Sequence, residues 1–298
     1  MKLGMHIVET SWRGGPARLA GLLAEIVGAA EDAGFDLISV ADHVWVHPII
    51  GGPLKNHLEA YTALSYIAAH TRRARLLALA TAASYRPPGL LAKMVTTLDV
   101  LSGGRAMLGI GSGDYPEEAS GLGLPFPAQA GDRFDLLEET VQACLAMWEG
   151  ERGSEQPFEG RHVRLERPLN LPQSLSRPHP PVLIAGSGEK RTLPLVARYA
   201  DACNIRPSPE IPRQLELLRR LCEEAGRDYD AIEKTAPFAF DVGEDGSKID
   251  ELIGRLRWLS GMGVETVFGW VVGVDSIRPL EIMAREVIPA AAELSPAA

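Results

Sequence analysis

The sequence predicts an α/β protein folded as a (β/α)₈ barrel, and three observations carry that prediction. Short apolar runs rich in β-branched residues alternate with longer runs that have helical spacing. The alternation repeats eight times within 298 residues, which fits a closed barrel with right-handed crossovers better than an open doubly wound sheet. No linker or shift in composition divides the chain, so we expect residues 1–298 to form a single domain.

Each repeat pairs one strand with the helix that follows it. The expected strands are residues 3–8, 35–41, 75–81, 105–111, 181–185, 201–205, 235–242 and 265–272. The expected helices are residues 17–33, 59–70, 90–101, 133–148, 192–199, 212–225, 249–260 and 276–288. Two insertions interrupt the rhythm: residues 44–58 after the second strand, and residues 150–180 after the fourth helix. Within the second, "FEGRHVRLERPLNLP" resembles a short hairpin.

Composition narrows the class of partner. A formal net charge of −9 argues against nucleic-acid binding and favours a small-molecule substrate. No apolar run approaches the roughly 18 residues of a membrane span, and "MKLGMHIVE" enters a strand pattern without a signal-peptide core, so we expect a cytoplasmic protein. The three cysteines lack CxxC spacing and predict neither a disulfide framework nor a zinc site.

The stretch "PVLIAGSGEKRTLPLVARYADACNI" predicts a strand, a turn on Gly186 and Gly188, and a helix whose free amides lie near residues 187–190. Helix N-termini attract phosphate. A plain tight turn with Ser187 as helix cap explains the same residues. The stretch by itself leaves both interpretations open.

In a (β/α)₈ barrel the loops after the strands gather at one mouth, where ligands bind. After the second strand, "VADHVWVHP" brings Asp42, His43 and Trp45 there. A carboxylate beside an imidazole sets its tautomer and pKa, and an indole offers a flat face to a ring. The alternative is a capping aspartate with a surface histidine. His43 and His47 have metal-binding spacing, but Pro48 argues for a loop, and we expect no metal site.

The fourth junction reads "LGIGSGDYPEE". It falls short of a dinucleotide fingerprint, because position 114 is not glycine and we expect no helix with the required acidic spacing to open there. Its small residues would let a planar ligand lie against the backbone. Asp114 is then a candidate acid or base, especially if burial raises its pKa. Glu9, which ends the first strand, either contacts a ligand or is solvated.

Four segments together resemble the luciferase-like monooxygenase superfamily, in particular its branch of oxidoreductases dependent on the deazaflavin coenzyme F-420. They are "FDLISVADHVW", "ATAASYRPPGLLAKMVTTLDVLSGGRAMLGIGSG", "GDRFDLLEETV" and "IAGSGEKRTLPLVARYADACN". The resemblance covers most of residues 1–205. It implies a bacterial-luciferase-like (β/α)₈ barrel that holds a flavin or deazaflavin, often as a homodimer.

By this resemblance His43 and Asp42 would face the deazaflavin ring, and "GSGEK" would hold the cofactor's phosphate. A bulge with a non-prolyl cis peptide is implied near Leu79 and Ala80, where many relatives carry Gly-Val. Taking the residue patterns and the resemblance together, the cofactor contacts that we expect are Asp42, His43, Trp45, Leu79, Ala80, Gly111, Ser112, Gly113, Ala185, Gly186, Ser187, Gly188, Glu189 and Lys190. Many relatives carry Trp or Asn at position 114. The superfamily's sugar-phosphate dehydrogenases instead place an acidic proton carrier there, and Asp114 resembles that residue.

The function we expect is hydride transfer between coenzyme F-420 and a small organic substrate, with catalytic roles for His43, Asp114 and Glu9. One alternative is a two-component monooxygenase that uses reduced FMN and dioxygen. Another is a flavin-binding protein without turnover. A metal-dependent barrel hydrolase is disfavoured, since the first strand carries the single His6 and no His-x-His pair.

Overall fold

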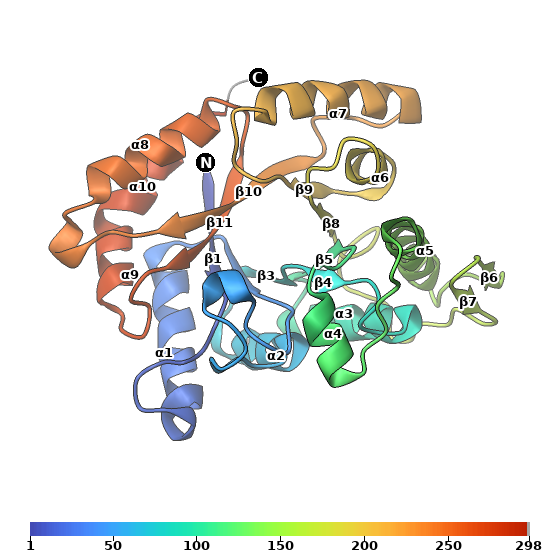
Figure 1. Ribbon diagram of the computed structural model, residues 1–298, viewed down its shortest axis with the longest axis horizontal. Coiled ribbons are helices and arrows are strands. Elements are labelled where there is room, and N and C mark those ends of the chain that lie inside the picture. Colours follow the sequence, from blue (N-terminus) through green and yellow to red (C-terminus); the bar gives the residue numbers. More distant parts are fainter. Residues whose placement is uncertain (297–298) are drawn as a thin grey trace.

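The computed structural model describes residues 1–296 as a closed barrel of parallel strands surrounded by helices (Figure 1). The strand order is β3-β2-β1-β11-β10-β9-β8-β5, and β3 pairs with β5 to close the ring. Every pairing in this ring is parallel. The predicted (β/α)₈ architecture is therefore confirmed.

The ring strands are β1 (Lys2–Ile7), β2 (Leu37–Val40), β3 (Arg75–Ala78), β5 (Ala106–Gly111), β8 (Val182–Ala185), β9 (Ala202–Asn204), β10 (Glu233–Phe240) and β11 (Thr266–Val271). The main covering helices are α1 (Pro16–Ala33), α2 (Ala60–His70), α3 (Pro88–Ser102), α5 (Ala130–Trp148), α6 (Thr192–Tyr199), α7 (Ile211–Ala225) and α8 (Ile249–Ser260). The last crossover consists of α9 (Arg278–Ile282), a π-helical turn (Met283–Val287) and α10 (Ile288–Ala292), where one continuous helix was expected.

Alternation along the strands divides the core into two layers. One set of side chains packs outward under the helices, as the hydrophobic sequence pattern of buried parallel strands requires. The other set points inward and fills the barrel centre; it consists of Leu37, Leu77, Met107, Leu183, Ala202 and Phe268. The centre is therefore packed, and a ligand has room only beyond it, at the C-terminal ends of the strands.

The expected third strand is interrupted. β3 ends at Ala78, a non-prolyl cis peptide joins Leu79 to Ala80, and β4 (Thr81–Ala82) resumes pairing with β5. The cis peptide lies where the family resemblance implied it. At this point β5 approaches β3 so closely that a Cβ on Gly109 would lie 2.1 Å from the Ala78 carbonyl oxygen, which leaves room for glycine alone.

A helix that the sequence analysis did not expect opens after the fourth junction. α4 (Pro116–Leu122) begins two residues after Asp114, so the expectation that no helix opens there is wrong. Its start has an ordinary physical basis: Pro116 needs no amide partner in the first turn, and Glu117 and Glu118 complement the positive end of the helix dipole.

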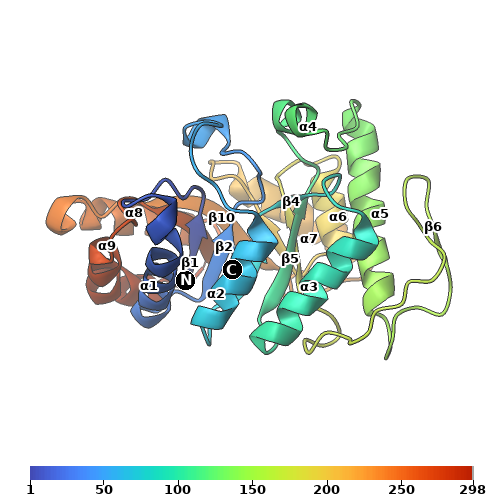
Figure 2. The same ribbon diagram turned by 90° about the horizontal axis from the view of Figure 1, so that it is seen from below.

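Both insertions leave the barrel wall. The second contains an antiparallel pair, β6 (Phe158–Glu159) with β7 (Arg164–Leu165), which confirms the predicted hairpin. The first contains a 3₁₀ turn, η1 (Pro48–Ile50), and rises beside α4 at the same end of the barrel (Figure 2). A second 3₁₀ turn, η2 (Glu244–Gly246), follows β10. None of the helices within residues 1–296 combines the length and apolar content that crossing a bilayer requires.

Candidate functional site

The mouth of the barrel has a wall of small residues and a wall of rings. Continuing the inward alternation beyond the packed centre, β5 and β8 present Gly111 and Ala185, whose approach leaves 3.8 Å between Ala185 Cβ and a Cβ built on Gly111. On β1 and β11, which pair with each other in another part of the ring, the corresponding inward positions hold His6 and Trp270. The small-residue wall is where a planar group has room to lie against the backbone.

His43 is held by Glu118. The Nδ1 of His43 lies 2.9 Å from Oε2 of Glu118, whose carboxylate is fully buried. The other carboxylate oxygen accepts the backbone amides of Val44 and Trp45, and the Tyr85 hydroxyl donates to Oε2 at 2.6 Å. Four donors thus fix one carboxylate, and the ionised acceptor orients the imidazole with Nδ1 as donor.

This arrangement shifts the ionisation of both partners. Burial by itself disfavours the imidazolium of His43, but the hydrogen bond and charge of Glu118 outweigh it and raise the pKa of His43 above its ordinary value. Burial likewise disfavours the Glu118 carboxylate, but its bonds from His43, Tyr85 and Trp45 hold the pKa of Glu118 below its ordinary value. The imidazolium form of His43 is therefore favoured over that of an ordinary histidine, with Nδ1 donating to Glu118.

Asp42 was expected to set the His43 tautomer, and the structure assigns it another role. Its carboxylate is buried and accepts both Arg86 nitrogens, at 2.6 and 2.9 Å, and the Thr81 hydroxyl at 2.6 Å. Arg86 also reaches Glu59 at 2.6 Å. Since successive side chains leave the strand end in different directions, Asp42 turns toward β4 and Arg86 while His43 turns toward α4.

The remaining residues expected after the strands occupy different parts of the rim. The Trp45 ring packs against α4, where a Cβ on Gly121 would lie 2.2 Å from it. Asp114 is exposed, so the burial that would favour its role as acid or base is absent; it lines a hollow of 580 Å³ with Arg133. Glu9 accepts the Ser11 amide at 2.6 Å and lies 3.5 Å from the Lys55 ammonium group.

The segment 185–190 forms the turn between β8 and α6. Gly186 has φ of +122°, in the region that favours glycine, and its amide donates to the Asn204 carbonyl at 3.0 Å. The Gly188 carbonyl accepts the amides of Thr192 and Leu193, which starts α6. Within residues 1–296, the backbone amides of residues 187–190 donate to no protein acceptor.

Two contacts hold this turn against α7. Glu189 accepts Arg213, with an Nη1–Oε2 distance of 3.1 Å, and the Ser187 carbonyl accepts the Gln214 amide at 3.4 Å. Lys190 stays exposed beside the free amides. The turn therefore offers several free N–H donors and an exposed ammonium group, which are the kinds of donor that bind a phosphate. Asp114, Gly113 and Ser112 lie on the loop after β5, the strand that pairs with β8.

Sequence reasoning missed three residues of the site: Glu118, Tyr85 and Arg86. They lie in or beside the third and fourth junctions, but their partners are distant in the chain; 75 positions separate His43 from Glu118. The available signal was "PEE" after Asp114, a proline followed by acidic residues, which is typical of a helix start.

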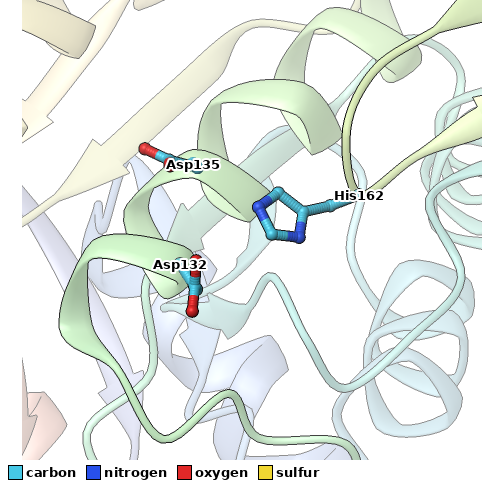
Figure 3. A group of neighbouring side chains, drawn as sticks. All are labelled: Asp132, Asp135 and His162. Carbon is cyan, nitrogen blue, oxygen red and sulfur yellow. The ribbon is translucent and has the colours of Figure 1, made fainter.

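One further cluster in the described chain offers metal-type ligands. Asp132 and Asp135 of α5 and His162 of the hairpin place their ligand atoms within 4.8 Å of one another (Figure 3). The carboxylates already have cationic partners: Arg161 lies 3.5 Å from Asp132 and 3.7 Å from Asp135, and Arg191 also bonds Asp135. We assign it as an ion-pair cluster that fastens the hairpin to α5.

Comparison with known proteins gives one family. A family model described as luciferase-like monooxygenase matches residues 1–288. A relative from Nakamurella multipartita, an F420-dependent glucose-6-phosphate dehydrogenase, is 33% identical over 220 residues. The aligned region covers 71% of this chain but only 60% of that relative.

Two solved structures share the fold along nearly the whole chain. A monooxygenase from Streptomyces bottropensis superposes with a TM-score of 0.80 at 20% identity, covering 97% of this chain and 99% of that one. A coenzyme F420-dependent tetrahydromethanopterin reductase from Methanopyrus kandleri gives 0.76 at 20% identity, covering 97% and 98%. At 20% sequence identity, these similarities show a shared fold and nothing about activity.

Proposed function

This chain belongs to the luciferase-like monooxygenase family, and on that premise we propose that it is an oxidoreductase that exchanges a hydride between coenzyme F-420 and a small organic substrate. The observation that carries the proposal is that two features occur at the same mouth of the barrel: a turn at residues 187–190 whose backbone amides have no protein acceptor, and the imidazole of His43, whose pKa is raised. The F420-dependent relative supports the choice of cofactor.

The residues present fit a deazaflavin. In the proposal, the ring lies against the small-residue wall of Gly111 and Ala185 and against the neighbouring Leu79 and Ala80. The phosphate accepts hydrogen bonds from the free amides of residues 187–190 and from Lys190. Gly188 allows the close approach, because any larger side chain there would begin 3.0 Å from the Thr192 hydroxyl and extend toward the phosphate. When bound, the deazaflavin supplies the hydride chemistry, and the chain supplies position and protons.

His43 is proposed to handle the proton that accompanies the hydride. Its Nε2 is the free edge of a ring whose Nδ1 is bound to Glu118, so a proton taken or given at Nε2 leaves the ring orientation unchanged. Glu118 acts through His43 and is a positioning residue. Asp114 is a second proposed proton carrier at the rim, and Glu9, tied to Lys55, closes the opposite side.

The proposal is tested by an anaerobic turnover assay with reduced coenzyme F-420 and a panel of ketones and activated alkenes. The visible absorbance of the cofactor reports the reaction. We expect protein-dependent oxidation of the cofactor with at least one substrate and its loss in His43→Asn. Oxygen-dependent product formation with reduced FMN, and none with the deazaflavin, would support the monooxygenase alternative. Tight binding of either cofactor without any turnover would support the non-catalytic alternative.

We also propose a homodimer formed through α3. Leu90, Met94 and Leu101 follow helical spacing along one face of this helix, and Leu90 and Leu101 are 52% and 69% exposed. An apolar stripe repeated on a second copy would pack isologously. Light scattering should give a dimer for the parent and a monomer for Leu101→Glu. A monomeric parent would contradict the proposal.

A further inference from the structure

A second cavity at the mouth lies on the side of the rings and away from the phosphate-type turn. It has a volume of 460 Å³, within the range of small-molecule sites. The end of β1, the insertion at residues 44–58 and the end of β11 enclose it. None of its lining residues belongs to the 185–190 turn or to the α4 region that holds His43.

The walls of this cavity combine polar side chains with apolar ones, some of them aromatic. Trp270 of β11 is 37% exposed, Val272 46% and Ile49 of η1 81%, and Trp12 closes the side toward α1. Indole rings supply a large contact area when a ligand covers them. Exposed apolar side chains that converge on one hollow indicate a site that gains free energy when an apolar ligand removes them from water.

The charged groups of this cavity disfavour binding of an anion. Its only ammonium group, Lys55, is paired with Glu9 at 3.5 Å. Burial lowers the pKa of His6 to about 4, so this ring is neutral near pH 7, and its Nδ1 is occupied by the Ser39 hydroxyl at 2.8 Å. Asp275 adds a further carboxylate. The lining contains no arginine and its one lysine is already paired, so it offers a phosphate ester little of the charge-assisted bonding that such a group favours.

Resting on the proposed function, we infer that the substrate of this chain is an uncharged carbonyl or alkene compound with a cyclic or aromatic apolar body, which is held between the cofactor ring and Trp270, and that sugar phosphates are excluded. The inference separates this chain from the relative named for glucose-6-phosphate. It also assigns Trp270 as a residue that determines substrate specificity.

The test measures binding and needs no turnover. Saturation-transfer NMR and calorimetry would compare 4-phenylcyclohexanone with glucose-6-phosphate on the parent protein, alone and with coenzyme F-420. We expect the ketone to bind and the sugar phosphate to show no saturable binding. Trp270→Ala should weaken ketone binding about tenfold or more, and Trp270→Phe should restore most of it. Trp258→Ala, on the exposed face of α8, is the matched control and should change nothing.

Two results would overturn the inference: glucose-6-phosphate binding as tightly as the ketone, or unchanged ketone affinity in a folded Trp270→Ala protein. Cofactor affinity, measured in the same samples, separates the two claims. If coenzyme F-420 fails to bind while the ketone binds at Trp270, the proposed function is contradicted and the apolar site stands.

Discussion

His43 Nδ1 and Glu118 Oε2 lie 2.9 Å apart, although 75 positions separate the two residues in the sequence. The contact joins the loop after β2 to the first turn of α4 and makes one carboxylate serve as acceptor for the ring, the Tyr85 hydroxyl and two loop amides. The ionisation of His43 is therefore controlled from a helix that belongs to a different strand's loop.

Glu118→Gln keeps the shape of the pair and removes its negative charge. The charge raises the pKa of His43, so its loss should move the His43 titration, followed by NMR of the ring protons, to lower pH. A pH-rate limb that depends on protonated His43 should move in the same direction. His43 titrating at the same pH in both proteins would show that Glu118 serves packing only.

Asp42→Asn should destabilise the fold. It leaves the Arg86 guanidinium buried without its bidentate partner, for which we expect a loss of about 3 kcal/mol in the free energy of unfolding, measured by urea titration. Glu59→Gln, which alters the more exposed partner of the same guanidinium, is the matched control and should cost about 1 kcal/mol or less. Equal losses in the two variants would remove the special role of Asp42.

Period and spacing predicted the barrel because each strand and helix is long enough to show its own pattern. β8 and α6 were placed in this way, and α6 begins at Thr192 as expected. The partner of His43 could not be predicted from the sequence. Asp42 is next to His43 in the chain, but consecutive side chains at a strand end point in different directions, so the carboxylate that reaches the imidazole is that of Glu118. α4 was missed since seven residues are too short for a hydrophobic period.

Gly188→Leu should weaken binding of coenzyme F-420 at least about tenfold while the unfolding midpoint stays nearly constant. The new side chain would start 3.0 Å from the Thr192 hydroxyl and cover the amides of residues 187–190. Gly254→Leu, in α8 with no atom near the added Cβ, is the control. If both variants bind the cofactor as the parent does, the phosphate lies elsewhere.

The variants Asp114→Asn and His43→Asn together show which residue carries the proton that accompanies the hydride. His43→Asn should lower turnover by roughly 10²-fold or more. If Asp114 also carries a proton, its variant should lose rate and flatten one limb of the pH profile, with cofactor affinity nearly unchanged. Full rate and unchanged limbs in Asp114→Asn would leave it as a solvated rim residue, in keeping with its exposure.

The measurement that tests the central claim most directly is a fluorescence titration of coenzyme F-420 with the purified protein, repeated with FMN. The account predicts saturable quenching of the deazaflavin with a Kd on the order of micromolar or tighter, weakened in Gly188→Leu and unchanged in Gly254→Leu. Saturable binding of FMN with none of the deazaflavin, or no saturable binding of either, would contradict it.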